Sequence, residues 1–200
     1  MINVYLLRHG QTAWNADGNR YCGRTDIPLT EKGIQQAHLV REQLKHIQFD
    51  RIYASPLQRS FKTAEIAGGG QEVIIEPRLI EADFGNWESK TQAVFAAEDP
   101  IALANWNKDP STARAGATGE TGLEIVNRVD SFFTECVNTY PAGSNLLVVA
   151  HNGLNRLYLA HKLGMPLRNY RKLVIENSVV SLFHLDKQGE LSLVHLNSRL

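Results

Sequence analysis

The stretch Ile2-Asn3-Val4-Tyr5-Leu6-Leu7-Arg8-His9-Gly10 decides the fold of this chain. Its apolar part predicts a buried β-strand, and polar residues follow directly where that strand ends. In open α/β sheets, ligands bind in the crevice at the carboxyl ends of the strands. Gly10 would let a bulky anion approach the backbone N–H groups there. Taken alone, an Arg-His-Gly triplet is more often a capped strand end than a catalytic site, so the rest of the chain must decide.

Further short apolar runs alternate with segments of helical period. They cover residues 51–54, 73–75 and 146–150. Residues 179–185 and 191–196 flank a Gly-containing turn and predict a closing hairpin at the edge of the sheet. We therefore predict an α/β fold with three αβα layers, a mostly parallel central sheet, an edge hairpin and a small helical cap insertion.

Helix starts are marked by capping patterns. The sequence Ser55-Pro56-Leu57-Gln58 predicts a helix with Ser55 as its N-cap, which puts Arg59 in the first turn. Thr121 and Glu124 form a second capping pattern before a long amphipathic stripe. Apolar residues at helical spacing also predict helices over residues 34–47 and 154–163.

The 200 residues suit one domain over residues 1–200. Residues 87–117 are less regular, and we interpret them as a cap insertion whose loop, residues 111–117, covers the site. A plain surface connection explains this segment equally well. Trp87 and Trp106 could stack on a ring of the substrate, but core packing is the more common role of such side chains, and we expect it for both.

Composition excludes several classes of function. With 21 basic and 21 acidic residues the formal net charge is zero, so we expect neither a nucleic-acid nor a membrane partner. Cys22 and Cys136 are too few for a disulfide scaffold and indicate a reducing compartment. The apolar N-terminal stretch is too short for a signal peptide or membrane span, so we expect a cytoplasmic protein. No metal-ligand spacing, Walker pattern or Gly-x-Ser-x-Gly pattern occurs, so we expect neither a metalloenzyme nor a nucleotide hydrolase nor a serine esterase.

Charged and polar groups fall where successive strands should end. They are Arg8 and His9, Arg59, Glu81, and His151 with Asn152 and Gly153. Together they predict a cationic pocket with one carboxylic acid, which suits a phosphate monoester. Transfer of a phosphoryl group needs mainly positioning and charge stabilisation, so no metal is required.

Each group has an expected role in that pocket. His9 is the nucleophile, with one ring nitrogen held by a backbone carbonyl and its neutral form favoured by Arg8. His151 donates to the phosphate oxygens that gain charge. Glu81 is the carboxylic acid placed to protonate a leaving alkoxide.

Several motifs occur together and in one order along the chain. They are Arg8-His9-Gly10-Gln11-Thr12 with Asn15, Gly23-Arg24, Ser55-Pro56-Leu57-Gln58-Arg59-Ser60, Glu81 with residues 84–88, and Ala150-His151-Asn152-Gly153. With these motifs the chain resembles the histidine phosphatase superfamily, the phosphoglycerate-mutase-like enzymes. It departs from the family pattern at Asn152, where a glycine often follows the second histidine.

The resemblance implies a phosphohistidine intermediate on His9 and no metal or organic cofactor. It further implies a phosphate pocket of Arg8, Arg59 and His151 with Asn15, and Glu81 as proton donor and later base. We assign Asn152 to the same pocket. For substrate binding we assign Gln11, Thr12, Cys22, Gly23 and Arg24.

The chain is short for a mutase of this family, so we predict a phosphatase acting on a small phosphate ester. Residues 84–88 and 196–199 resemble those of α-ribazole phosphatases, which makes α-ribazole 5'-phosphate a candidate substrate. A phosphoglycerate-mutase-type transfer and a sugar bisphosphate phosphatase stay open. From another class, a catalytically silent module that binds phosphorylated ligands is the alternative, but such a module would not need Glu81. The sequence also leaves a homodimer open.

Overall fold

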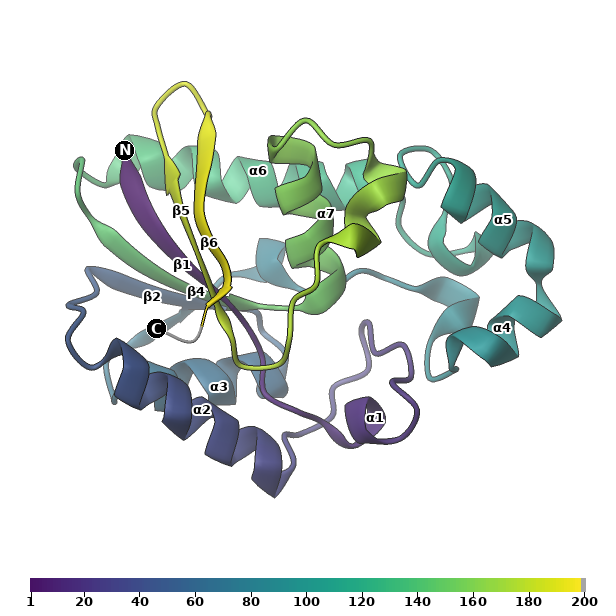
Figure 1. Ribbon diagram of the computed structural model, residues 1–200, viewed down its shortest axis with the longest axis horizontal. Helices are drawn as coiled ribbons and strands as arrows, with labels where there is room; N and C mark the ends of the chain where they lie inside the picture. The colour runs from purple at the N-terminus through teal and green to yellow at the C-terminus, as the bar shows by residue number, and fades with distance from the viewer. Residues whose placement is uncertain (199–200) are drawn as a thin grey trace.

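A single sheet lies at the centre of the computed structural model, which describes residues 1–198 (Figure 1). Within these residues its strand order is β3-β2-β4-β1-β5-β6. The strands are β1 (Ile2–Arg8), β2 (Arg51–Ala54), β3 (Val73–Ile75), β4 (Asn145–Ala150), β5 (Val180–Leu185) and β6 (Leu191–Ser198). β1 to β4 run parallel to one another, whereas β5 is antiparallel to β1 and β6 is antiparallel to β5. The predicted mostly parallel sheet with an edge hairpin is confirmed. Arg199, part of the C-terminal stretch considered above, lies outside the described residues.

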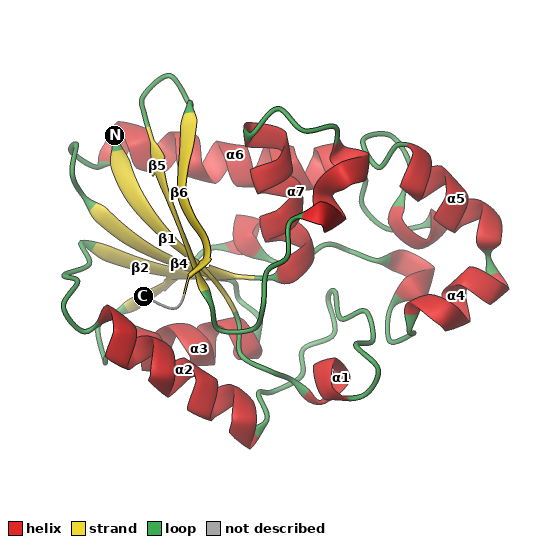
Figure 2. Ribbon diagram, viewed as in Figure 1, coloured by secondary structure: helices red, strands yellow, loops and turns green. Residues whose placement is uncertain are grey.

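Helices cover both faces of this sheet (Figure 2). They are α1 (Ala13–Ala16), α2 (Glu31–Leu44), α3 (Gln58–Ala67), α4 (Gln92–Glu98), α5 (Pro100–Lys108), α6 (Gly122–Thr139) and α7 (Asn152–Lys162), with short 3-10 turns η1 (Pro77–Leu79), η2 (Gly85–Trp87), η3 (Ala115–Ala117) and η4 (Leu167–Lys172). The helices α2 and α3 lie on one face, and α6 and α7 lie on the other. The three predicted layers are therefore present. No helix among residues 1–198 is both long and apolar enough to cross a membrane.

The period of two in β1 divides the core between the two faces. Tyr5 and Leu7 pack with α2 and α3, whereas Val4 and Leu6 pack with α6 and α7. All four side chains are buried. Burying an apolar side chain of this size stabilises the fold by about 1.5–3 kcal/mol, so the two-sided strand is a large part of the core.

The helix starts agree with the sequence in one case and differ in another. Thr121 Oγ1 accepts from the Glu124 N–H and the Glu124 carboxylate accepts from the Thr121 N–H, so the predicted capping box opens α6. The prediction that Ser55 caps α3 is wrong. That helix begins at Gln58 with Leu57 as its N-cap and has no side-chain cap. The Ser55 hydroxyl accepts from the Leu57 N–H, outside the helix, and contacts His151.

Residues 87–117 carry α4 and α5, which lie beyond the end of the sheet (Figure 1). Trp87 and Trp106 are almost fully buried and pack edge to face with ring centroids 5.8 Å apart, as expected for core residues. The loop of residues 111–117 lines a cavity of about 690 Å³ against α5. It does not line the cavity at His9, contrary to the prediction that it covers the site. The division into one domain with a cap stays a prediction.

The register of the sheet gathers the ends of three strands. Arg8 pairs with Ala150, and Ala54 pairs with Val149, so β1, β4 and β2 end side by side. Gly10 follows β1, and a Cβ there would lie 2.4 Å from the carbonyl oxygen of Gly33 in α2. Contact with α2 therefore explains this glycine, rather than the approach of an anion that the sequence suggested.

Candidate active site

A cavity of about 250 Å³ opens at these strand ends. Six of the predicted site residues line it, namely Arg8, His9, Asn15, Cys22, Glu81 and Asn152. Behind them lie two predicted residues that are fully buried, Arg59 and His151. The rings of His9 and His151 have centroids 5.1 Å apart. The sheet thus brings together histidines that are separated by most of the chain.

His9 is held as a neutral imidazole with a defined tautomer. Its Nδ1 lies 2.7 Å from the Gly10 carbonyl oxygen. A carbonyl only accepts hydrogen bonds, so Nδ1 carries the proton and Nε2 keeps its lone pair. Burial lowers the pKa of His9 well below its ordinary value, and the charges of Arg59 and Arg8 lower it further. Both features agree with what the sequence predicted for a nucleophile.

Ser55, which directly follows β2, positions His151. Its Nε2 lies 2.7 Å from Ser55 Oγ, and this oxygen also accepts from the Leu57 N–H at 3.3 Å. If the Ser55 hydroxyl donates its proton to Nε2, the ring proton of a neutral His151 lies on Nδ1. Nδ1 is buried and has no hydrogen-bond partner in the structure. In that tautomer His151 presents an unused N–H donor beside His9.

Two arginines supply positive charge around the histidines. Arg8 Nη1 donates to the Ile175 carbonyl at 2.7 Å, and the Arg59 guanidinium donates to the carbonyls of Gly23 and Thr25, both at 2.8 Å. In each guanidinium the Nε–H is buried and without a partner. A buried donor left unpaired is costly, so an oxyanion that accepts these bonds would be stabilised.

Glu81 lies against the N-terminus of α7. Its Oε2 accepts from the Gly153 N–H, and its Oε1 accepts from the Leu154 and Ala82 N–H groups, all at 2.9 Å. This close approach needs Gly153, because a Cβ there would lie 3.0 Å from Glu81 Oε1. Gly153 therefore makes room for the carboxylate.

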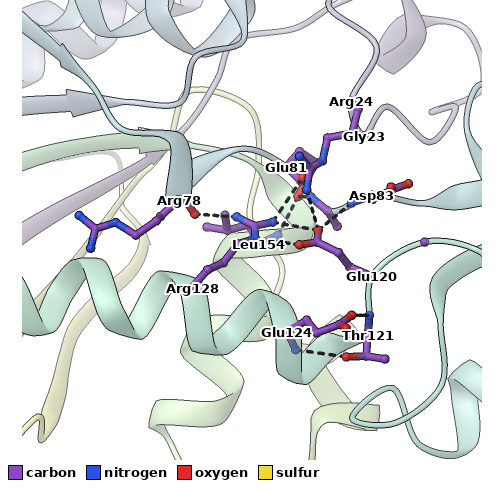
Figure 3. A network of polar contacts seen from close by, with 12 residues as sticks. Gly23, Arg24, Arg78, Glu81, Asp83, Glu120, Thr121, Glu124, Arg128 and Leu154 are labelled. Atoms are coloured by element: carbon purple, nitrogen blue, oxygen red, sulfur yellow. Dashed lines mark hydrogen bonds and ion pairs between the residues drawn. The ribbon is translucent and has the colours of Figure 1, made fainter.

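A polar network holds the loop that carries Glu81 (Figure 3). Arg128 of α6 donates to the carbonyls of Arg78 and Glu81, at 2.6 and 3.4 Å, and pairs with Glu120 at 3.0 Å. Glu120 in turn accepts from the Asp83 N–H at 2.9 Å. Burial alone would raise the pKa of Glu120, but the hydrogen bond and charge of Arg128 outweigh it and lower that pKa. The backbone on both sides of Glu81 is thereby fixed.

A family model described as the histidine phosphatase superfamily, branch 1, matches residues 4–199. This chain belongs to the histidine phosphatase superfamily. It is 34% identical over 200 residues to the adenosylcobalamin/α-ribazole phosphatase of Salmonella typhimurium, covering 99% of this chain and 97% of the relative. It is also 34% identical over 186 residues to a probable phosphoglycerate mutase, GpmB, of Yersinia pestis, covering 90% of this chain and 84% of that one.

Solved structures agree with the fold of this histidine phosphatase. The phosphoserine phosphatase mutant (H9A) from Entamoeba histolytica in complex with phosphoserine superposes with a TM-score of 0.90 at 28% identity. The match covers 100% of this chain and 98% of that one. The α/β fold class is therefore shown by both the sheet topology and a solved relative.

Four residues predicted to bind substrate in this histidine phosphatase do not line the cavity, namely Gln11, Thr12, Gly23 and Arg24. Gln11 bonds with Thr30 and Gln36, and Thr12 is the N-cap of α1. The Gly23 N–H is bound by Glu88, and Arg24 forms an ion pair with Glu120. All four hold neighbouring backbone in place, which a motif match alone does not reveal.

Cys22 and Asn15 do line the cavity. The Cys22 thiol is half-buried, and burial raises its pKa to about 11, so it is a neutral, unreactive group. Asn15 Oδ1 accepts from the N–H and hydroxyl of Thr12 and from Asn177. Its amide NH₂ is then the group left to face the cavity.

Sequence reasoning missed several lining residues of the histidine phosphatase. They include Tyr21, Arg156, Tyr170 and Arg171. Arg156 has a signal in the sequence, since it follows Asn152 by four residues and so shares its helix face. Tyr170 and Arg171 lie in η4, which has no pattern that links it to the site. Among residues 1–198, no group of His, Cys, Asp and Glu side chains is arranged to hold a metal ion.

Proposed function

We propose that this protein is a phosphomonoesterase that hydrolyses a small phosphorylated metabolite through a phosphohistidine on His9. The observation that carries the proposal is the Nδ1–H of His9 bonded to the Gly10 carbonyl at 2.7 Å. It leaves the Nε2 lone pair of a neutral ring next to Arg8 and Arg59. A neutral nucleophile inside a cationic pocket suits attack on a dianionic phosphate.

In the first step, His9 Nε2 attacks phosphorus in line with the ester bond. The N–P bond forms, the P–O ester bond breaks, and the leaving oxygen takes a proton from Glu81. The unpartnered donors of Arg8, Arg59 and His151 stabilise the charge on the phosphoryl oxygens. The amide groups of Asn15 and Asn152, which line the cavity, contribute further contacts.

In the second step, Glu81 takes a proton from a water molecule, and that water attacks the phosphorus of phosphohistidine. The N–P bond breaks, inorganic phosphate forms, and His9 returns to its starting state. One carboxyl group serves as acid and then as base because it loses a proton in the first step and regains one in the second. Glu81 gives one proton to the leaving oxygen in the first step and regains one from water in the second, so the protons balance over the cycle.

The relatives of this chain suggest candidates for the substrate. α-Ribazole 5'-phosphate is the candidate suggested by the full-length similarity to the α-ribazole phosphatase of Salmonella typhimurium. The structural relative in complex with phosphoserine adds a phosphorylated amino acid. A cytoplasmic location stays part of the proposal, and a homodimer stays open.

A second candidate function is intramolecular phosphoryl transfer of the phosphoglycerate mutase type. The similarity to the probable phosphoglycerate mutase of Yersinia pestis supports it. A mutase returns the phosphoryl group from His9 to a hydroxyl of the bound product instead of to water. Release of inorganic phosphate from 3-phosphoglycerate, without formation of 2-phosphoglycerate, separates the two reactions.

A phosphate-release screen over several dozen monoesters tests the proposal. We expect turnover of at least one metabolite, its loss in His9→Ala, and a fall of about 10²- to 10⁴-fold in Glu81→Gln. The panel should contain p-nitrophenyl phosphate, whose leaving group needs little protonation. Glu81→Gln should lose less activity on this ester than on an alkyl ester.

Two outcomes would contradict the proposal. Binding of inorganic phosphate without turnover of any monoester would favour a silent binding module. Full activity in His9→Ala would instead show that the phosphoryl group does not pass through this histidine.

A further inference from the structure

The part of the cavity away from the histidines is also cationic. Arg20, Arg156 and Arg171 line it together with Arg8, and the one carboxylate among the lining residues is Glu81. Arg20 is neutralised by Asp17 at 2.7 Å. Within residues 1–198, neither Arg156 nor Arg171 forms an ion pair with an Asp or Glu. These two guanidiniums therefore face the cavity without a counter-ion.

Neutral groups hold Arg171 in place. Its Nη2 donates to the Tyr21 hydroxyl at 3.0 Å, and its Nη1 donates to Asn107 Oδ1 at 2.7 Å. Its guanidinium carbon lies 5.1 Å from the centre of the Tyr170 ring. Hydroxyl, amide and aromatic partners fix the direction of the side chain but leave its charge uncompensated.

The arginines that line the cavity away from the histidines come from different elements. Arg8 ends β1, Arg156 lies in α7 and Arg171 lies in η4. The charges that lower the pKa of His9 are those of Arg59 and Arg8. Burial first, and then the charge of Arg156, lowers the pKa of Arg8 to about 10. Burial also lowers the pKa of Arg156, whose buried Nε–H has no partner, and the charge of Arg171 adds to that effect. Arg8, Arg156 and Arg171 thus line one cavity, where their like charges oppose one another.

Like charges that are partly buried side by side destabilise a protein unless a ligand compensates them. Around the cavity, Arg8, Arg59, Arg156 and Arg171 lack a carboxylate partner, and Glu81 is the single opposing charge. Glu81 has to be protonated for the first step of the proposed reaction, so a phosphate dianion at His9 would leave two of the four positive charges uncompensated. From this arrangement we infer that Arg156 and Arg171 form a second anion subsite, and that the substrate carries a carboxylate besides its phosphoryl group.

The inference rests on the proposed function and narrows its substrate to a phosphorylated hydroxy or amino acid. A carboxylate would leave one positive charge uncompensated, and its planar pair of oxygens matches the planar fork of a guanidinium. A second phosphate is tested as the alternative below. The inferred subsite also argues against a substrate in which the part beyond the phosphoryl group is a neutral nucleoside. Both guanidiniums can donate two parallel hydrogen bonds to a carboxylate, a match that neither Tyr21 nor Tyr170 provides.

Paired substrates test this subsite in the wild-type protein. 3-Phosphoglycerate and glycerol 3-phosphate differ only in a carboxylate that replaces a CH₂OH group. We expect kcat/KM to be at least about tenfold higher for 3-phosphoglycerate, the gain of one charge-assisted contact. Fructose 1,6-bisphosphate and fructose 1-phosphate form a second pair, and a larger ratio there would assign the subsite to a phosphate and overturn the carboxylate.

Variants then locate the selectivity. Arg156→Gln and Arg171→Gln should each lower the 3-phosphoglycerate to glycerol 3-phosphate ratio by about tenfold. Arg168→Gln is the matched control, because Arg168 lies in the same 3-10 turn as Arg171, is exposed and does not line the cavity. It should keep the wild-type ratio.

The outcomes separate the two proposals. Hydrolysis of p-nitrophenyl phosphate that depends on His9, combined with equal kcat/KM for both three-carbon substrates, would overturn the subsite and leave the proposed function standing. A preference for α-ribazole 5'-phosphate over every carboxylated ester would overturn it as well. Hydrolysis of no ester would contradict the proposed function and the subsite with it.

Discussion

The hydroxyl of Ser55 lies 2.7 Å from Nε2 of His151, across 96 positions of sequence. Both groups are buried completely. Ser55 Oγ also accepts from the Leu57 N–H at 3.3 Å, and its own proton can be donated to the imidazole. Donation by Ser55 selects the tautomer that leaves an N–H on the Nδ1 of His151.

Replacement of Ser55 by alanine should reduce catalysis more than stability. In Ser55→Ala the His151 tautomer is no longer fixed, and we expect kcat to fall by roughly ten- to a hundredfold. Steady-state kinetics on p-nitrophenyl phosphate measures this effect. Ser60→Ala is the matched control, since the Ser60 hydroxyl is equally buried but donates to the Val149 carbonyl at 2.6 Å. A wild-type kcat in Ser55→Ala would contradict the assigned tautomer.

Gly153→Ala should displace the carboxylate of Glu81. The added Cβ would lie 3.0 Å from Glu81 Oε1 and 3.1 Å from Phe84 Cζ. A carboxylate that moves by a fraction of an ångström loses alignment, and we expect kcat to fall by about tenfold or more. Alanine favours a helix over glycine by about 1 kcal/mol, so urea unfolding should show little net loss of stability. Unchanged kcat would mean that Glu81 is not held by this contact.

Acidification should destabilise the ligand-free protein through its two buried histidines. Burial and the nearby arginines lower the folded-state pKa of His9 well below its ordinary value of 6.5, and the pKa of His151 is lowered in the same direction. Below that ordinary value the unfolded chain binds protons that the folded protein does not. Stability is therefore fully present above 6.5 and is lost as the pH falls below it.

The variant His9→Gln isolates this contribution. From about pH 7.5 to about pH 5.5, the unfolding free energy of the wild type should fall by about 1.4 kcal/mol more than that of the variant. Urea denaturation at the two pH values gives the difference. Equal losses in both proteins would show that His9 titrates normally in the fold.

Arg128 and Arg24 both contact Glu120, yet they should differ in importance. The Arg128 side chain is 17% exposed and also binds the carbonyl of Arg78, whereas the Arg24 side chain is 41% exposed. We expect Arg128→Gln to lower the unfolding free energy by about 2–3 kcal/mol, because buried partners stay unpaired. Arg24→Ala should cost less than about 1 kcal/mol.

The same pair tests whether Arg24 contacts the substrate. Since Arg24 does not line the cavity, Arg24→Ala should keep the wild-type KM. Arg128→Gln should lower kcat as well, because the loop of Glu81 loses its support. Equal losses of stability in the two variants, or a raised KM in Arg24→Ala, would contradict this division of roles.

Most of the fold could be predicted from local patterns in the sequence. Buried parallel strands such as β1 and β4 are continuous apolar runs, and the hairpin of β5 and β6 surrounds a turn with Gly189 at a positive φ of 81°. Each of these patterns spans only a few residues, so it can be recognised without knowledge of the tertiary structure.

The site was only partly predictable for a physical reason. His9, Glu81 and His151 follow strands or loops that end at one edge, and topology alone brings them together. Ser55 carried a strong capping pattern, but its hydroxyl accepts from the Leu57 N–H before the helix begins and contacts His151, a tertiary partner that no local pattern predicts. Arg171 reaches the cavity from η4 through contacts with Tyr21 and Asn107 that no local pattern encodes.

Direct detection of the covalent intermediate tests the central claim most directly. The protein is mixed with a radiolabelled monoester, quenched in base during turnover, and digested, and the labelled peptide is sequenced. The account predicts a base-stable, acid-labile label on His9 that is absent from His9→Ala. A protein that turns over the ester with no label on any histidine, or with the label on His151, would contradict it.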